Sequence, residues 1–219
     1  SINATSCGEN SYNDIILENY SITRNEIDFK LNIDENNFST TLKGKHNLFN
    51  IMFAVAIAKK IGLANEEIRH AIDNISKITN MRLESIPYAE DSLIINDAYN
   101  ASPTSMKAAV DVISDLNDFE FKTLVLGSMF ELGSNEVEYH SGVGTYINNN
   151  SRGINLVISV GVLAKNITDN INNKDISTLH FSTVEEVTDY LKANKHKNEV
   201  ILFKASRSMK LETIINNIK

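Results

Sequence analysis

The sequence has little cysteine, little proline and no tryptophan. Its single cysteine, Cys7, excludes an intrachain disulfide framework and fits a reducing compartment. No segment approaches the roughly 18 consecutive apolar residues that a membrane helix needs. The N-terminal segment has neither the basic nor the apolar region of a secretory signal. We therefore expect a protein without a membrane span.

Positive charge is also scarce, with 21 Lys and Arg against 28 Asp and Glu and a formal net charge of −7. The basic residues form no cluster, so we expect no nucleic-acid partner. The hydrophobic share of 42% and the charged share of 22% are typical of a folded globular protein and exclude a disordered chain.

Several motifs that would indicate a particular chemistry are missing from the sequence. It contains no G-x-x-x-x-G-K-[ST] phosphate loop and no G-x-S-x-G nucleophile turn. Gly142-Val143-Gly144 begins a dinucleotide fingerprint, but Ile147 stands where the third glycine belongs. The histidines are scattered and no Cys/His spacing suits zinc, so we expect no metal site in this chain.

The first 85 residues combine a β-rich segment with two helices. Apolar or alternating runs predict strands at 15–17, 27–33 and 38–42. Apolar residues at helical spacing predict a helix that Gly62 ends and a second helix that Asn65 caps. This region lacks a complete α/β unit, so we interpret it as the end of a larger domain.

From residue 90 onward, strands and helices alternate. Continuous apolar runs predict strands at 93–95, 123–127, 156–160, 178–181 and 200–203. Amphipathic segments predict helices at 103–116, 137–147, 163–171, 183–193 and 208–218. This alternation is typical of a parallel sheet covered on both faces. The predicted fold class is therefore α/β, with a domain boundary near residue 85.

Polar residues follow the predicted strands, at the edge where open α/β sheets bind ligands. The strand ends concerned are 96–100, 127–128 and 204–207. Asp97 lies in the most polar of them, and its carboxylate can accept two hydrogen bonds from a ribose diol. The same segment would equally form a helix-capping turn before Pro103, so both interpretations stay open.

Two further candidates lie nearer the N-terminus. The segment 43–50 is a strand-to-helix junction whose asparagine amides could hold an adenine edge or an anion. Capping of the helix by Asn47 is the alternative, and local chemistry favours it. Arg82 lies between the two halves, where its planar guanidinium suits a phosphate, although a lone arginine is more often a solvated surface residue.

Five segments of the chain, taken together, resemble the Mur ligase family. In order they are Gly44-Lys45-His46-Asn47-x-x-Asn50, Met81-Arg82-Leu83-Glu84, Asn96-Asp97-Ala98-Tyr99-Asn100-Ala101-Ser102-Pro103-x-Ser105-Met106, Val125-Leu126-Gly127-Ser128-Met129-x-Glu131-Leu132-Gly133 with His140, and Phe203-Lys204-Ala205-Ser206-Arg207-x-Met209. The strings D-A-Y-N-A-x-P-x-S-M and L-G-x-M-x-E-L-G, within residues 97 to 133, are the most specific. The sequence departs from the family pattern at Ser102, Ser128 and Ala205, where Asn, Asp and Gly are usual.

The resemblance implies a three-domain enzyme. Residues 1–85 would be the C-terminal part of the central ATP-binding domain, and residues 86–219 would be the Rossmann-like C-terminal domain. The phosphate loop and the Mg²⁺ ligands would lie upstream, so we expect this fragment to be inactive alone. In the implied reaction a peptide carboxylate becomes an acyl phosphate at the expense of ATP, and an incoming amine then displaces the phosphate.

The resemblance also implies roles for individual residues. Catalytic roles fall to Arg82, Tyr99 and Asn100. Contacts with the nucleotide fall to His46, Asn47, Asn50, Arg82 and Asp97. Further candidates, for the dipeptide end of the site or for domain closure, are Lys204 and Arg207. The implied cofactors are ATP and Mg²⁺, without a metal ligand in this fragment.

The implied substrates are UDP-N-acetylmuramoyl-tripeptide and D-alanyl-D-alanine, which are joined during peptidoglycan precursor synthesis. The resemblance further implies a monomer in the bacterial cytoplasm.

Two alternatives stay open. One is a sibling ligase that adds a different amino acid or polyglutamate, against which the D-A-Y-N-A and E-L-G strings argue. The other is a non-catalytic α/β module that binds a nucleotide or a partner, which the absent phosphate loop supports if these residues are the whole gene product.

Overall fold

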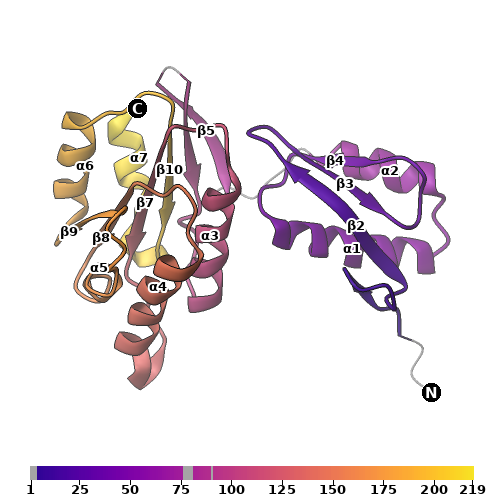
Figure 1. The fold of residues 1–219 in the computed structure, drawn as a ribbon, viewed down its shortest axis with the longest axis horizontal. Coiled ribbons are helices and arrows are strands. Elements are labelled where there is room, and N and C mark those ends of the chain that lie inside the picture. The colour runs from indigo at the N-terminus through magenta and orange to yellow at the C-terminus, as the bar shows by residue number, and fades with distance from the viewer. Residues whose placement is uncertain (1–3, 76–80, 90) are drawn as a thin grey trace. The chain divides into compact units, whose positions relative to one another are not determined.

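The computed structural model describes residues 4–75, 81–89 and 91–219 (Figure 1). The chain divides into two compact units, Ser1–Ile78 and Thr79–Lys219. Over the described residues, no helix is both long and apolar enough to cross a membrane.

The first unit is a four-stranded sheet with two helices. Its strands lie in the order β1 (Cys7–Gly8), β2 (Ile15–Ile22), β3 (Ile27–Leu31) and β4 (Phe38–Thr40). β1 runs parallel to β2, and the other neighbours are antiparallel. Helices α1 (Lys45–Lys60) and α2 (Asn65–Asp73) contribute to the same core, in which the rings of Phe29 and Phe38 stack with centroids 5.5 Å apart.

Both helices of this unit begin differently from the sequence prediction. α1 starts at Lys45 after Gly44, whose φ of 86° suits glycine, so capping by Asn47 is wrong. The Asn47 amide lies in the first turn and donates to the carbonyl of Lys43 (2.7 Å). Capping of α2 by Asn65 is also wrong, because the N-cap is Ala64, whose N–H donates to the carboxylate of Glu67 (2.8 Å).

The second unit is built on a six-stranded sheet. Its order is β5 (Glu84–Tyr88), β6 (Ser92–Asn96), β10 (Glu199–Lys204), β7 (Phe121–Gly127), β8 (Leu156–Val160) and β9 (Ser177–Phe181). Only the edge strand β5 is antiparallel to its neighbour, so the predicted mostly parallel α/β sheet is confirmed. The chain divides slightly before the boundary expected near residue 85, because β5 pairs with β6 throughout.

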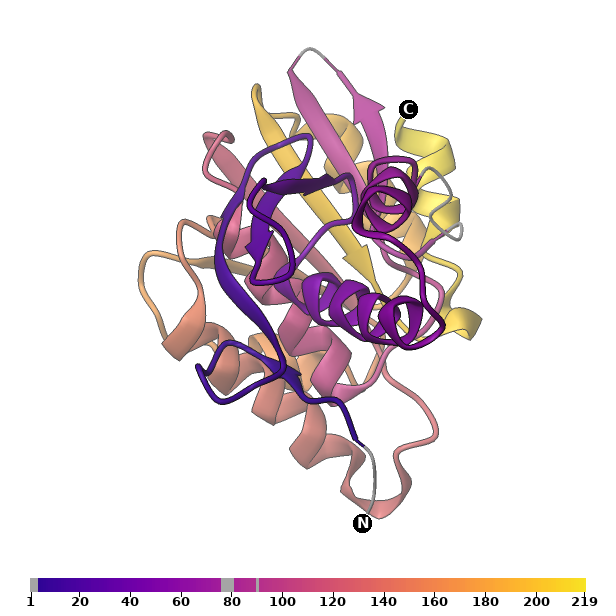
Figure 2. The ribbon, with the colours of Figure 1, turned by 90° about the vertical axis from the view of Figure 1, so that its right-hand side faces the viewer.

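Helices cover both faces of this sheet (Figure 1 and Figure 2). From β6 the chain advances toward β9 through α3 (Pro103–Asp115), α4 (Glu136–Asn150) and α5 (Lys165–Thr168). It returns to β10 through α6 (Val184–Ala193), and α7 (Glu212–Ile218) follows and shares a core with α6. Because parallel crossovers are right-handed, two crossovers that run in opposite directions along the sheet place their helices on opposite faces. The neighbouring strands β6 and β10 are therefore followed by helices on opposite faces, and open α/β sheets bind ligands at such a reversal.

Three elements differ from the predicted ones. β5 contains Pro87, which an edge strand tolerates, and its short sequence carries no periodic signal. The helix expected at 163–171 is only the short α5. The helix expected at 208–218 is split into a 3₁₀ turn, Arg207–Met209, and α7, because Lys210 between them has a left-handed backbone with φ of 52°.

Candidate functional site

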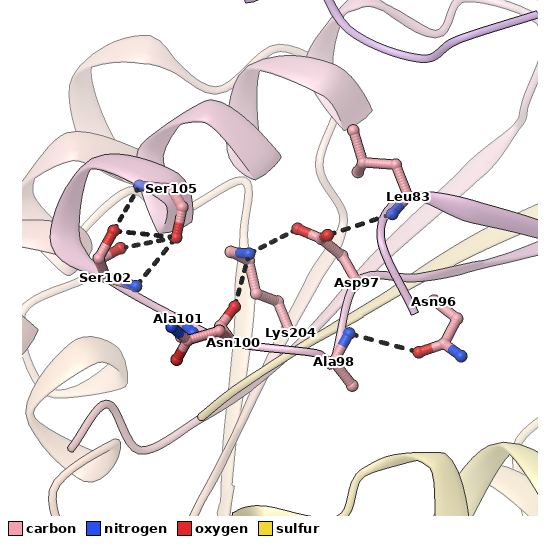
Figure 3. Close-up of polar contacts among 9 residues, drawn as sticks. All are labelled: Leu83, Asn96, Asp97, Ala98, Asn100, Ala101, Ser102, Ser105 and Lys204. Atoms are coloured by element: carbon pink, nitrogen blue, oxygen red, sulfur yellow. Dashed lines mark hydrogen bonds and ion pairs between the residues drawn. The ribbon is translucent and has the colours of Figure 1, made fainter. Parts of the chain in front are cut away.

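The carboxyl ends of β6 and β10 bring two predicted site residues together (Figure 3). Asn96 pairs with Phe203 at the last rung of this ladder, and the N–H of Asp97 donates to the carbonyl of Phe203 (2.9 Å). The ammonium of Lys204 then lies 2.5 Å from Oδ2 of Asp97 and donates to the carbonyl of Asn100 (3.1 Å). The Lys204 side chain is only 3% exposed and that of Asp97 15%, so this ion pair is largely shielded from water.

The other carboxylate oxygen of Asp97 reaches back to the start of the second unit. Oδ1 accepts a hydrogen bond from the N–H of Leu83 (3.1 Å). Asp97 therefore joins three segments that are far apart in the sequence. An ionised carboxylate has about four lone-pair sites, and these two donors occupy one on each oxygen. Acceptor capacity for further hydroxyl donors is left on both oxygens.

Arg82 sits between two residues with left-handed backbones, Met81 with φ of 61° and Leu83 with φ of 51°. The N–H of Tyr99 donates to the carbonyl of Met81 (3.0 Å). The guanidinium of Arg82 lies 4.4 Å from the centroid of the Tyr99 ring, within the range of a cation–π contact. Arg82, predicted from an isolated motif, thus belongs with Asp97 to one cluster. Its members are Arg82, Leu83, Asp97, Tyr99, Asn100 and Lys204.

Tyr99 and Asn100 occupy the turn between β6 and α3. Tyr99 is 43% exposed, and Oδ1 of Asn100 accepts from the N–H of Ala101 (2.8 Å). The helix begins directly afterwards, where Oγ of Ser102 accepts from the N–H of Ser105 (3.3 Å; Figure 3). Of the two earlier interpretations of this segment, helix capping is confirmed for Ser102, and the ribose contact of Asp97 stays a prediction.

The remaining predicted residues belong to other elements. Arg207, in the 3₁₀ turn after β10, is half exposed and pairs with Glu212 at 2.5 Å. His46, Asn47 and Asn50 belong to the first unit, at the start of α1, where the amide of Asn50 donates to Oδ1 of Asn47 (2.9 Å). His46 and Asn50 are exposed.

The third candidate strand end, Gly127-Ser128, is a structural junction. Oγ of Ser128 accepts from the N–H of Ala164 (3.2 Å), and its carbonyl accepts from the N–H of Ser206 (3.1 Å). Oγ of Ser206 in turn accepts from the N–H of Phe130 (2.9 Å). Ser128 is 2% exposed and so ties together the loops that follow β7, β8 and β10.

Glu84 is a residue of this site that sequence reasoning named only as part of a motif. Its Oε2 accepts from the N–H of Met81 (3.1 Å) and from the amide of Asn96 (3.1 Å). It therefore holds the strained segment against the end of β6. The only signal for it in the sequence was its position beside Arg82, since its partner Asn96 comes from the neighbouring strand.

The site does not fit a metal ion. Across residues 4–75, 81–89 and 91–219, no group of three or more His, Cys, Asp and Glu side chains is arranged to hold one. The carboxylate of Asp97 already faces the ammonium of Lys204. The chemistry available to these residues is the acceptance of hydroxyl hydrogen bonds by Asp97 and the binding of an anion by Arg82.

Comparison with known proteins places these residues within a family pattern. Residues 81–207 match the family described as "Mur ligase, glutamate ligase domain". Among curated proteins, the UDP-N-acetylmuramoyl-tripeptide–D-alanyl-D-alanine ligase of Bacillus subtilis is 38% identical over 99% of this chain and 48% of its own length. The protein of the same name from Haemophilus influenzae is 32% identical over 80% of this chain and 38% of its own length. The chain thus spans less than half the length of these curated relatives.

Solved structures show the same fold. MurF from Acinetobacter baumannii superposes with a TM-score of 0.83 at 24% identity, over 98% of this chain and 46% of that one. MurF ligase from Thermotoga maritima, solved in complex with ADP, superposes with a TM-score of 0.78 at 21% identity, over 97% of this chain and 47% of that one.

Proposed function

The chain belongs to the Mur ligase family, and we propose that it forms the C-terminal half of an ATP-dependent ligase that joins D-alanyl-D-alanine to UDP-N-acetylmuramoyl-tripeptide. The observation that carries this proposal is the relative from Bacillus subtilis, which bears that name and is 38% identical along 99% of the chain. The D-A-Y-N-A and L-G-x-M-x-E-L-G strings support the same choice within the family.

Each unit has a proposed place in that enzyme. The second unit, which contains the matched residues 81–207, corresponds to the C-terminal Rossmann-like domain, predicted as 86–219. The first unit corresponds to the end of the central ATP-binding domain, predicted as 1–85. The phosphate loop and the Mg²⁺ ligands would belong to the part of the enzyme outside this chain, since the described residues offer no metal site.

The nucleotide contacts follow from the chemistry of the cluster. Asp97 would accept hydrogen bonds from ribose hydroxyls on the lone pairs that Leu83 and Lys204 leave unused. Arg82 would meet the phosphates, because its planar guanidinium binds phosphate oxygens in pairs. Asn50 would contact the adenine, His46 and Asn47 would shape that junction, and Tyr99 and Asn100 would face the closed site.

Binding of the dipeptide falls to Arg207 in this proposal. Its guanidinium is half exposed and suits the carboxylate of D-alanyl-D-alanine. Lys204 was predicted for the same end of the site, but its ammonium is turned toward Asp97. A monomeric state and a location in the bacterial cytoplasm stay predictions.

A chimeric enzyme tests the proposal. The part of the Bacillus subtilis ligase that this chain matches is replaced by the 219 residues, and phosphate release from ATP is measured. We expect release that requires both UDP-N-acetylmuramoyl-tripeptide and D-alanyl-D-alanine, and none from the 219 residues alone. A reference chimera carries the matching part of the Haemophilus influenzae enzyme. An active reference beside an inactive test chimera would contradict the proposal, as would turnover by the chain alone.

The role of Asp97 is tested in the same chimera. Asp97→Ala removes a charged acceptor, whose hydrogen bonds contribute about 1.5–3 kcal/mol, so kcat/KM for ATP should fall about 10- to 100-fold. Asp169→Ala is the matched control, because that carboxylate pairs with Lys165 on an exposed helix surface. Unchanged ATP kinetics in the Asp97 variant would remove this residue from the site.

A further inference from the structure

We propose that Lys204 is a positioning residue: through the carboxylate of Asp97, it holds the left-handed backbone that presents Arg82 over Tyr99. Whether this presentation serves the nucleotide rests on the proposed function. The positioning itself is a property of the second unit and can be measured on this chain.

The ammonium of Lys204 is buried between the carboxylate of Asp97 and the carbonyl of Asn100. The side chain is 3% exposed, and it lies against Oδ2 of Asp97 (2.5 Å) and the carbonyl of Asn100 (3.1 Å). A buried ammonium is stable only when its attraction to a partner offsets its lost hydration. Among the described residues, the charged partner is the carboxylate of Asp97. A lysine so enclosed is badly placed to bind a substrate and well placed to orient Asp97.

The main chain of Asp97 is held independently of Lys204. Its N–H donates to the carbonyl of Phe203 (2.9 Å), and the next N–H, from Ala98, donates to Oδ1 of Asn96 (3.3 Å). The backbone of Asp97 is therefore fixed without Lys204, and what Lys204 orients is the Asp97 side chain. With one oxygen drawn to Lys204, the other faces Leu83 (Figure 3).

The backbone at Leu83 needs such a contact. Leu83 and Met81 have φ of 51° and 61°, a region that residues other than glycine rarely adopt because Cβ approaches the following carbonyl oxygen. Strained backbone persists only where surrounding contacts determine it. The contacts here are Asp97 on the N–H of Leu83, Glu84 on the N–H of Met81, and Tyr99 on the carbonyl of Met81.

Arg82 lies between the two strained residues. Its direction therefore depends on both, and its guanidinium reaches the Tyr99 ring at 4.4 Å. Loss of the bond to Leu83 would let that backbone relax and would turn Arg82 away. Asp97 and Arg82 are two predicted nucleotide contacts from different segments. Lys204 thus holds both of them in place.

Amide hydrogen exchange at Leu83, followed by NMR on the 219-residue chain, tests this inference. Lys204→Met should accelerate exchange at Leu83 at least tenfold and should remove the cross-relaxation between the Arg82 side chain and the Tyr99 ring. Lys204→Arg should keep both within threefold of the wild type. The amides of Ile94 and Leu202, buried in β6 and β10, report that the sheet stays intact. The control Lys165→Met, which removes an exposed Lys–Asp pair, should leave Leu83 unchanged.

Either of two results would overturn the inference. One is exchange at Leu83 within twofold of the wild type in an intact Lys204→Met chain, and the other is retention of the Arg82–Tyr99 contact. If Lys204→Met does not fold, the double variant Lys204→Met, Asp97→Asn leaves no buried unpaired charge. Since a neutral amide is a weaker acceptor than a carboxylate, Leu83 should still exchange faster in it, and wild-type exchange there would also refute the inference.

ATP kinetics separate this inference from the proposed function. In the chimera, Lys204→Met should raise KM for ATP about tenfold, with rescue by Lys204→Arg. A response of Leu83 and Arg82 without any change in ATP kinetics would support the positioning by Lys204. It would then contradict the nucleotide role that the proposed function gives to Arg82.

Discussion

Substitution of His140 by glutamine should make the second unit less sensitive to mild acid. The imidazole of His140 in α4 is 0% exposed. Its Nε2 accepts from the N–H of Met129 (2.8 Å), in the loop after β7. Nδ1 lies 2.6 Å from the carbonyl of Glu136 and must therefore carry the proton, which makes the folded ring neutral. A second proton would have to sit on Nε2, facing the N–H of Met129.

Burial lowers the pKa of His140 below its ordinary value of 6.5, against smaller opposing effects of Glu136. The unfolded chain therefore binds more protons than the folded chain once the pH falls below 6.5. The stabilising contribution is complete above that pH and is lost as the pH falls. Between about pH 7.5 and about pH 5.5, uptake of one proton by the unfolded state alone lowers the free energy of unfolding by up to about 1.4 kcal/mol, a factor of about ten in the ratio of folded to unfolded protein.

Glutamine keeps an acceptor for the N–H of Met129 but does not titrate, so His140→Gln should lose less stability over this pH range. Urea unfolding at the two pH values, followed through NMR signals of β7 and β10, reports the second unit. Other titrating groups contribute equally to both proteins, including Glu199, whose pKa burial raises, so the comparison isolates His140. Equal losses in the two proteins, within about 0.3 kcal/mol, would refute a neutral buried imidazole.

Two further predictions concern the helices of the second unit. Gly144→Ala in α4 would place Cβ 2.2 Å from the carbonyl oxygen of Ile167 and should lower the free energy of unfolding by about 1–3 kcal/mol. Gly142→Ala in the same helix meets nothing within 4 Å and should raise it by about 0.5–1 kcal/mol, so urea unfolding that shows equal effects would contradict this packing. Ser102→Ala removes the acceptor for the N–H of Ser105 and should lower the free energy of unfolding by about 1 kcal/mol, and no loss would show that the cap does not stabilise α3.

Local chemistry predicted several elements of this fold correctly. Ser102 and Pro103 begin α3, and Thr183 with Glu186 forms the capping box of α6, because both devices act within one turn of the chain. The continuous apolar runs are the parallel strands for a similarly local reason, since both faces of such a strand are buried.

Errors arose where a longer-range contact decides the structure. Asn65 has a good capping side chain, yet its amide donates to the carbonyl of Ile33 (2.8 Å), in the loop after β3. At the start of α2, the carboxylate of Glu67 instead accepts from the N–H of Ala64. β5 carries little strand signal of its own, and it forms because β6 offers it a partner. No pattern within either segment encodes those partners.

The candidate site divides in the same way. The sequence by itself determined which chemical groups stand at the end of each strand, because polar residues that follow a buried apolar run must lie at the edge of the sheet. Asp97 directly follows β6, and Lys204 is the last residue of β10. Only the tertiary structure decided that these two groups meet, because β10 lies beside β6 although 107 positions separate Asp97 from Lys204. The same sheet order buries the ammonium of Lys204 against the carboxylate of Asp97, a pairing that no local pattern in the sequence encodes.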